Sequence, residues 1–144
     1  MKKTFLLFTL FLAASTLSFS QNKDFNKIKK LMKVQSDCWN EGDIDCFMES
    51  YWKSEKLQFI GSKGVTYGWQ NTLDRYKKSY PTKADMGQLT FELINLDKRS
   101  RKVISLVGKW HLQRGGDLEN LEGHFLIIWK KIKGNWVIVS DHSS

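Results

Sequence analysis

The stretch Phe125–Ser144, FLIIWKKIKGNWVIVSDHSS, decides the fold class of this chain. Two runs rich in β-branched and aromatic residues flank a glycine-containing turn at 133–135, which predicts a hairpin of two strands. Alternate residues of the first strand are apolar on both faces, with Phe125 and Ile127 on one and Leu126 on the other. An antiparallel sheet with one solvated face would carry one polar set. We therefore expect this sheet to be covered on both faces.

Further strands are predicted upstream of this hairpin. The segments 88–96 and 102–113 are long, rich in β-branched and aromatic residues and separated by polar loops. The shorter segment 57–67 predicts a small hairpin around a Gly-Ser-Lys-Gly turn. Almost everything after residue 86 is therefore expected to be strand.

Three amphipathic helices are predicted ahead of these strands. Apolar residues recur every three to four positions from residue 25 to Gly42, from Asp43 to residue 51, and again from residue 69. Asp43 is a good N-cap, and Pro81 should stop the third helix. Helices followed by a run of antiparallel strands indicate an α+β fold in one domain.

The first twenty residues are interpreted as a secretory signal. Lys2 and Lys3 precede an apolar run at 5–14, and small residues follow at Ser18 and Ser20. The run is too short to span a membrane, which needs roughly 20 residues. We expect a signal peptide over 1–20, a single domain over 21–144, and a periplasmic or secreted protein without a membrane span.

Charge and cysteine content limit the function classes. The net charge is +8, but the basic residues are spread over different elements, which argues against a nucleic-acid groove. The glycines lie at turns and no histidine has ligand spacing from a cysteine, so no cofactor and no metal site is expected. Cys38 and Cys46 could form a disulfide in an exported protein; the interpretation we favour is two small buried thiols.

The apolar outer face of the predicted sheet needs a cover. Three helices suffice for one face, so the simplest cover for the other is a second copy of the same sheet. We therefore predict a homodimer joined through the outer sheet face.

Three motifs carry a resemblance to a known family. The stretches WNEGDIDCFMESYW (39–52), GVTYGWQNTLDRYKKSYP (64–81) and KGNWVIVSDHSS (133–144) resemble the nuclear transport factor 2-like superfamily, and the SnoaL-like and ketosteroid-isomerase-like small bacterial proteins in particular. The resemblance implies a cone, in which a strongly curved antiparallel sheet wraps three N-terminal helices and leaves a pocket beside the first helix. Such proteins are commonly dimers.

The resemblance extends to the association domain of calcium/calmodulin-dependent kinase. That relative carries charged, arginine-type residues in its pocket, and the matching positions here are Gly108, Ile127 and His142. The same anionic ligand is therefore not expected at those positions. The carboxylate base of the ketosteroid isomerases has no identifiable counterpart either.

Strand alternation predicts which residues share the pocket. If Trp136 and Ile138 face inward, Ser140 and His142 also face inward and Asp141 faces outward, provided that no bulge intervenes. Adding inward positions of the helices and of the strand 102–113 gives the candidate ligand-binding set Gln35, Trp39, Tyr51, Tyr76, Trp110, Ser140 and His142.

These residues leave three functions open. The first is an exported protein that binds a small molecule in an aromatic-lined pocket. The second is an acid-base enzyme of isomerase or dehydratase type, with His142 and Tyr51 or Tyr76 as catalytic candidates. The third is a dimeric assembly module with a vestigial cavity. The tryptophans could instead be core residues, Gln35 could bond a strand end, and His142 could satisfy terminal backbone groups.

Overall fold

The computed structural model describes residues 22–144. The predicted signal peptide over 1–20 lies outside the described residues. The chain divides into two compact units, residues 1–30 and 31–144. One continuous helix covers residues 22–40, and its last turns belong to the second unit, which contains the whole sheet. No helix in the described part of the chain is long and apolar enough to cross a membrane.

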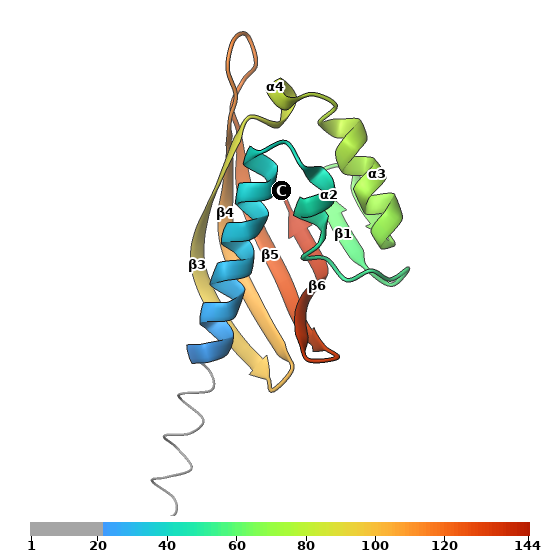
Figure 1. Ribbon diagram of the computed structural model, residues 1–144, viewed down its shortest axis with the longest axis vertical. Helices are drawn as coiled ribbons and strands as arrows, with labels where there is room; N and C mark the ends of the chain where they lie inside the picture. The colour runs from blue at the N-terminus through green and yellow to red at the C-terminus, as the bar shows by residue number, and fades with distance from the viewer. Residues whose placement is uncertain (1–21) are drawn as a thin grey trace, which may run out of the picture. The chain divides into compact units, whose positions relative to one another are not determined.

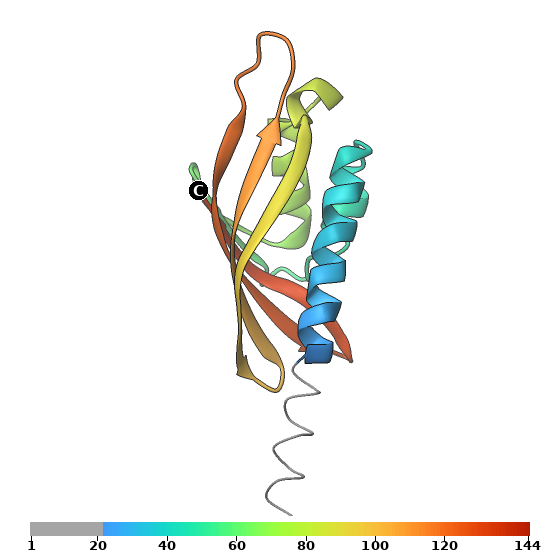
Figure 2. The same cartoon turned by 90° about the vertical axis from the view of Figure 1, so that its left-hand side faces the viewer.

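The second unit is built on one six-stranded sheet in the order β2-β1-β6-β5-β4-β3 (Figure 1). The sheet is curled but not closed, as the turned view in Figure 2 shows. It is mixed rather than antiparallel as predicted, because β1 pairs with β6 in parallel and every other pair is antiparallel. The strands are β1 (Gln58–Gly61), β2 (Gly64–Tyr67), β3 (Gln88–Ser100), β4 (Val103–Gln113), β5 (Leu121–Ile132) and β6 (Asn135–Ser143).

Short helices complete the unit: α2 (Ile44–Met48), α3 (Trp69–Ser79) and α4 (Lys83–Met86). The side chain of Asp43 caps α2 by accepting a hydrogen bond from the Cys46 N–H, as its position predicts. The helix α3 ends two residues before Pro81, also as predicted. The short α4 was not predicted, and Thr82 starts it through a reciprocal capping box with Asp85.

The core lies between the helices and the inner face of the sheet. Ile104, Leu106, Trp129 and Ile138 are completely buried there. On the outer face Leu126 remains 44% exposed, so the chain itself leaves part of that face uncovered. The α+β class predicted from the sequence is confirmed.

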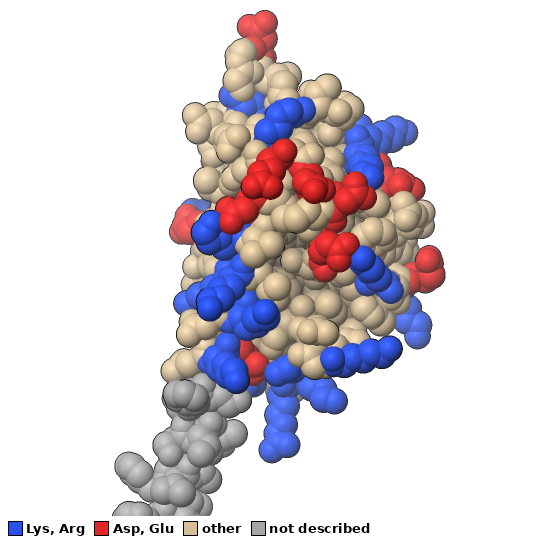
Figure 3. Space-filling view, viewed as in Figure 1, with Lys and Arg blue, Asp and Glu red and all other residues tan. Residues whose placement is uncertain are grey.

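Charged side chains do not form a single basic surface. On the face shown in Figure 3, several acidic side chains lie near one another, others are scattered, and basic side chains occur in several separate places. Lys33, Lys53 and Lys77 each lie within a salt-bridge distance of a carboxylate.

Candidate functional site

A cavity of about 450 Å³ lies within the second unit, on the inner side of the sheet. Its walls come from the end of the helix over 22–40, from α2, α3, β1 and from strands β3 to β6. Five of the predicted site residues line it: Gln35, Trp39, Tyr51, Tyr76 and Trp110. Ser140 and His142 do not, whereas Asp141 and Ser143 do.

A hydrogen-bonded polar cluster lies in the wall of this cavity. The Tyr51 hydroxyl donates to Asp141 Oδ2 at 2.6 Å, and the Ser143 hydroxyl donates to Asp141 Oδ1 at 2.7 Å. The Tyr76 hydroxyl lies 3.5 Å from the Tyr51 hydroxyl, at the limit of a hydrogen bond. Both carboxylate oxygens of Asp141 therefore have a partner, while the Tyr76 hydroxyl can still bond strongly to another group.

Burial shifts the ionisation of this cluster. Desolvation raises the pKa of Asp141, against the opposing effects of the hydrogen bonds from Tyr51 and Ser143 and of the nearby His142. Desolvation and the Asp141 charge raise the pKa of Tyr51 well above its usual value. Desolvation likewise raises the pKa of Tyr76. The site thus contains two neutral phenols beside a carboxyl that holds its proton to higher pH than an exposed one.

A β-bulge at Val139 brings Asp141 into the cavity. Ile138 is opposite Trp129 and Ser140 is opposite Ile128, so Val139 has no partner on β5. Beyond the bulge, Asp141 shares the inner side with Ile127, its partner on β5. The predicted alternation was therefore wrong after residue 138, because it assumed a regular strand.

The bulge also explains why Ser140 and His142 lie outside the cavity lining. Ser140 is in register with Ile128, and His142 is exposed in register with Leu126 on the outer side. The bulge lies where the other neighbour of β6 changes. Ile138 bridges to Tyr51, and from Ser140 onward the neighbour is β1.

The helix ending at residue 40 contributes two neighbouring side chains to the cavity. Gln35 is 2% exposed, and its Nε2 donates to the Phe47 carbonyl at 3.4 Å. Its Oε1 has no hydrogen-bond partner in the part of the chain that the structure describes. Trp39 lies one turn later and donates from Nε1 to the Met86 carbonyl at 3.0 Å. Gln35 thus lines the cavity, and its amide bonds a backbone carbonyl of α2 rather than the strand end that the alternative predicted.

Aromatic rings form most of the remaining wall. Trp39 packs edge-on against Phe47 and Tyr80, with ring centroids 5.0 and 4.9 Å away. Tyr76 packs against Phe47 at 5.2 Å and against Phe59 at 5.3 Å. These contacts make the rings part of a fixed structure, since edge-to-face pairs stabilise each other beyond their burial.

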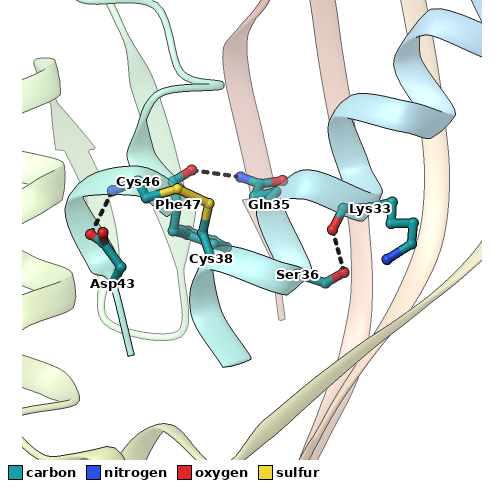
Figure 4. The surroundings of a disulfide bond; sticks show 7 residues. All are labelled: Lys33, Gln35, Ser36, Cys38, Asp43, Cys46 and Phe47. Atoms are coloured by element: carbon teal, nitrogen blue, oxygen red, sulfur yellow. Dashed lines mark hydrogen bonds between the residues drawn. A yellow bond between two sulfur atoms is a disulfide. The ribbon is translucent and has the colours of Figure 1, made fainter. Parts of the chain in front are cut away.

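A disulfide joins two walls of the cavity. Cys38 and Cys46 are bonded, with their Cα atoms 5.5 Å apart, and not free as we had favoured (Figure 4). The bond ties the helix that carries Gln35 to α2, which carries Phe47. Figure 4 shows the Gln35 amide directed at Phe47 beside this bond. The tight corner at Gly42, which has a φ of 84°, brings the two cysteines into range.

Several residues of the site were not predicted. The aromatic rings Phe47 and Phe59 have the periodicity of core residues, which hides any role in a cavity. Arg75 and Arg114 also line the cavity, and they come from α3 and from the loop after β4. Nothing local in the sequence signals that these two elements meet. In the described part of the chain, no cluster of His, Cys, Asp or Glu could hold a metal ion.

Comparison with known proteins identifies similar folds. A scan of protein-family models and a search of curated proteins gave no match. An NTF-2 like protein of unknown function from Shewanella oneidensis is 37% identical over 84% of this chain and 98% of its own, with a TM-score of 0.79.

Two further solved structures share the fold at lower identity. A cystatin-like domain of unknown function from Nostoc punctiforme is 17% identical over 85% of this chain and 76% of its own, with a TM-score of 0.72. An NTF2-like protein of unknown function from Pseudomonas putida is 13% identical over 83% of this chain and 84% of its own, with a TM-score of 0.65.

Proposed function

The chain belongs to the nuclear transport factor 2-like superfamily, and we propose that it binds a small, partly apolar molecule in the cavity of the sheet. One observation carries this proposal. Tyr51 and Asp141 form a buried pair at 2.6 Å in the wall of a cavity of about 450 Å³ that is otherwise mostly aromatic. A buried carboxyl is costly, and titratable groups perturbed by burial concentrate at functional sites.

The cavity has the properties of a small-molecule site. Its volume falls within the range of about 300–1,000 Å³ that is usual for such sites. Apolar rings with a few convergent polar groups are the usual lining, because rings supply affinity and polar groups supply orientation. Trp39, Phe47 and Phe59 supply the rings, and Tyr76 and Asp141 supply polar groups.

Two unpartnered polar atoms support the proposal further. Gln35 Oε1 is a buried acceptor and Trp110 Nε1 is a buried donor, and neither has a hydrogen-bond partner among residues 22–144. Both residues line the cavity. Buried polar atoms are nearly always bonded, so a ligand or bound water that offers one donor and one acceptor would complete both residues.

Thermal-shift screening against steroids, small acids and aromatic metabolites tests the proposal. A ligand at a hundred times its dissociation constant should stabilise the protein by about 2.7 kcal/mol, which raises Tm by several degrees. For any hit, Tyr51→Phe and Asp141→Asn should weaken binding about tenfold, because each alters the polar cluster while keeping the volume.

His142→Asn is the matched control. It lies next to Asp141 but is exposed on the outer side, so binding should be unchanged. Equal loss in all three variants would contradict a binding site in this cavity. So would a hit that remains bound when Trp110→Phe and Gln35→Leu are combined and that protects no cavity residue in NMR.

A second candidate, acid-base catalysis, is favoured by the same pair. Burial raises the pKa of Asp141 toward neutrality, and Tyr51 donates to it, so a carboxyl poised for proton transfer has a phenol beside it. In this version Asp141 takes the role that the sequence had suggested for His142. If Asp141→Asn abolishes turnover of a hit but changes its dissociation constant less than twofold, the protein is an enzyme; an unchanged turnover rules this candidate out.

A further inference from the structure

Charged side chains gather at one part of the cavity wall. Lys63, Arg75 and Arg114 line the cavity, and none of them forms a salt bridge to an Asp or Glu within the described residues. The only carboxylate side chains in the lining are Asp141, which is buried, and Glu122, which is exposed. Three cationic side chains thus share the lining with two carboxylate side chains, of which one belongs to the polar cluster already described.

Arg75 is held in place with donors to spare. Its Nη1 donates to Thr66 Oγ1 at 2.8 Å and to the Gly64 carbonyl at 3.2 Å. The guanidinium also lies over the Phe59 ring, 5.0 Å from its centroid. A Cβ at Gly61 would lie only 2.6 Å from Nη2, so the missing side chain makes room for the group. No hydrogen bond from Nε or Nη2 is found among the described residues.

Arg114 reaches the same region from a different element. It follows β4, and its Nε donates to the Glu119 carbonyl at 2.6 Å, which leaves both Nη groups unpaired within the described part of the chain. Both Arg114 and Arg75 lower the pKa of the Tyr80 phenol, against a larger upward effect of burial. Their two charges therefore act on one point of the cavity wall, where Tyr80 lies.

We infer that the ligand carries a single anionic group such as a carboxylate, and that this group lies between Arg75 and Arg114 while an apolar body fills the aromatic part of the cavity. The inference rests on the proposed function. A guanidinium binds a carboxylate through two parallel hydrogen bonds, and partial burial strengthens such charge-assisted bonds. The polar cluster holds no cationic side chain, and Asp141 repels an anion when it is ionised, so the anionic end lies at the arginines.

These arginines are not at the positions of the arginine-type residues that the sequence comparison considered. Those positions hold Gly108, Ile127 and His142, on the strands. Here the positive charges come from α3 and from two loops at the ends of strands. The sequence argument against an anionic ligand therefore applied to one part of the sheet only.

Matched probes that differ only in charge test the inference. The first pair is 2-naphthoate and 2-naphthamide, and the second is octanoate and octanamide, each titrated by calorimetry against the full mature chain. We expect each carboxylate to bind about tenfold more tightly than its amide at low salt, and the difference to shrink as salt rises. The combined variant Arg75→Gln/Arg114→Gln should remove this preference and leave amide binding within about twofold.

Controls separate charge from folding. Arg101→Gln removes a charge from the exposed turn between β3 and β4, outside the cavity lining, and should keep the preference. Because Arg75 also anchors the β1–β2 hairpin, Arg114→Gln and Lys63→Gln are measured singly, and each should reduce the preference by about two- to fivefold.

The outcomes distinguish this inference from the proposed function. Equal affinity for a carboxylate and its amide, or an undiminished preference in the double variant, overturns the anionic assignment and leaves the cavity as a binding site for neutral molecules. Failure of all four probes at concentrations on the order of 1 mM would overturn both.

Discussion

Neighbouring residues on the inner and outer sides of β6 differ in burial. Asp141 is 2% exposed on the inner side and accepts two hydrogen bonds, whereas His142 is exposed on the outer side in register with the half-exposed Leu126. The buried carboxyl is an informative exception to the usual preference, and the exposed Leu126 becomes informative only together with the exposed Val107 beside it. We therefore propose the inner side as the binding site and the outer side as the association surface.

The largest expected difference is in the free energy of unfolding, when adjacent residues on the two faces of β5 are truncated to alanine. Ile127 is 3% exposed on the inner side of β5, whereas its neighbour Leu126 is 44% exposed on the outer side. Ile127→Ala should lower the free energy of unfolding by about 2–5 kcal/mol, because it leaves a void in the core. Leu126→Ala should lower it by less than about 1 kcal/mol. Urea unfolding of the two variants measures the difference, and equal losses would contradict the assignment of the faces.

Removal of the disulfide should have the second largest effect on stability, and it should alter the cavity on the inner side only. The double variant Cys38→Ser/Cys46→Ser should lower the free energy of unfolding by about 2 kcal/mol, because the bond closes a short loop in the unfolded chain. It should also weaken binding of any cavity ligand, since Phe47 loses its tether to the first helix. Denaturation of the wild-type protein with and without reductant gives the same comparison without mutation. A variant as stable as the oxidised protein would show that the bond contributes nothing to the wall.

The Asp141 carboxyl should make stability depend on pH. Its pKa is raised above the ordinary value of 3.8 by burial, so the native state holds this proton more tightly than the unfolded chain. The stability that the neutral carboxyl contributes is present below 3.8 and is lost as the pH rises through the native pKa.

The Asp141→Asn variant isolates this effect. At low pH it should lie within about 1 kcal/mol of the wild type, because a neutral acid and an amide are alike in shape. As the pH rises, the wild type should lose stability relative to the variant, measured by urea unfolding at a series of pH values. The His142→Asn variant keeps the Asp141 carboxyl and should lose stability with rising pH as the wild type does, at slightly higher pH because His142 lowers the Asp141 pKa. A pH-independent difference for Asp141→Asn would mean that this carboxyl ionises alike in both states.

The elements of the fold could be predicted because each has a local signal. Periods of three to four residues marked the helices, and Pro81 and the glycine-containing turns marked their ends and the hairpins. The strand predicted over 102–113 corresponds to β4, which extends over Val103–Gln113. The parallel pairing of β1 with β6 was not predicted, because nothing in the sequence of either strand indicates its partner.

The site was harder to predict for a geometric reason. One unpaired residue at Val139 reverses the facing of everything after it, so strict alternation from Trp136 selected His142 in place of Asp141. The bulge is produced by the change of neighbour along β6, which is a tertiary feature. Gln35, Trp39, Tyr51, Tyr76 and Trp110 were placed in the cavity wall correctly, since no irregularity separates them from the signal that predicted them.

The smallest effect on the folded chain, and the most specific one, is expected on the outer side. Leu126 is paired across the β4–β5 register with Val107, which is 37% exposed, so two apolar side chains lie together on an uncovered sheet face. The homodimer predicted from the sequence would cover them. Leu126→Glu should then give a monomer at micromolar concentration in sedimentation, while unfolding of the isolated chain changes by less than about 0.5 kcal/mol.

Leu118→Glu is the control, because Leu118 is 38% exposed in the loop between β4 and β5 and has no place in this interface. A dimer in the wild type and in Leu118→Glu, but not in Leu126→Glu, would establish the outer face as the association surface. A monomeric wild type would contradict it, and the exposed Leu126 would then require a different partner. Ligand binding in the monomeric Leu126→Glu variant should remain unchanged, because every residue of the polar cluster lies on the opposite side of the sheet.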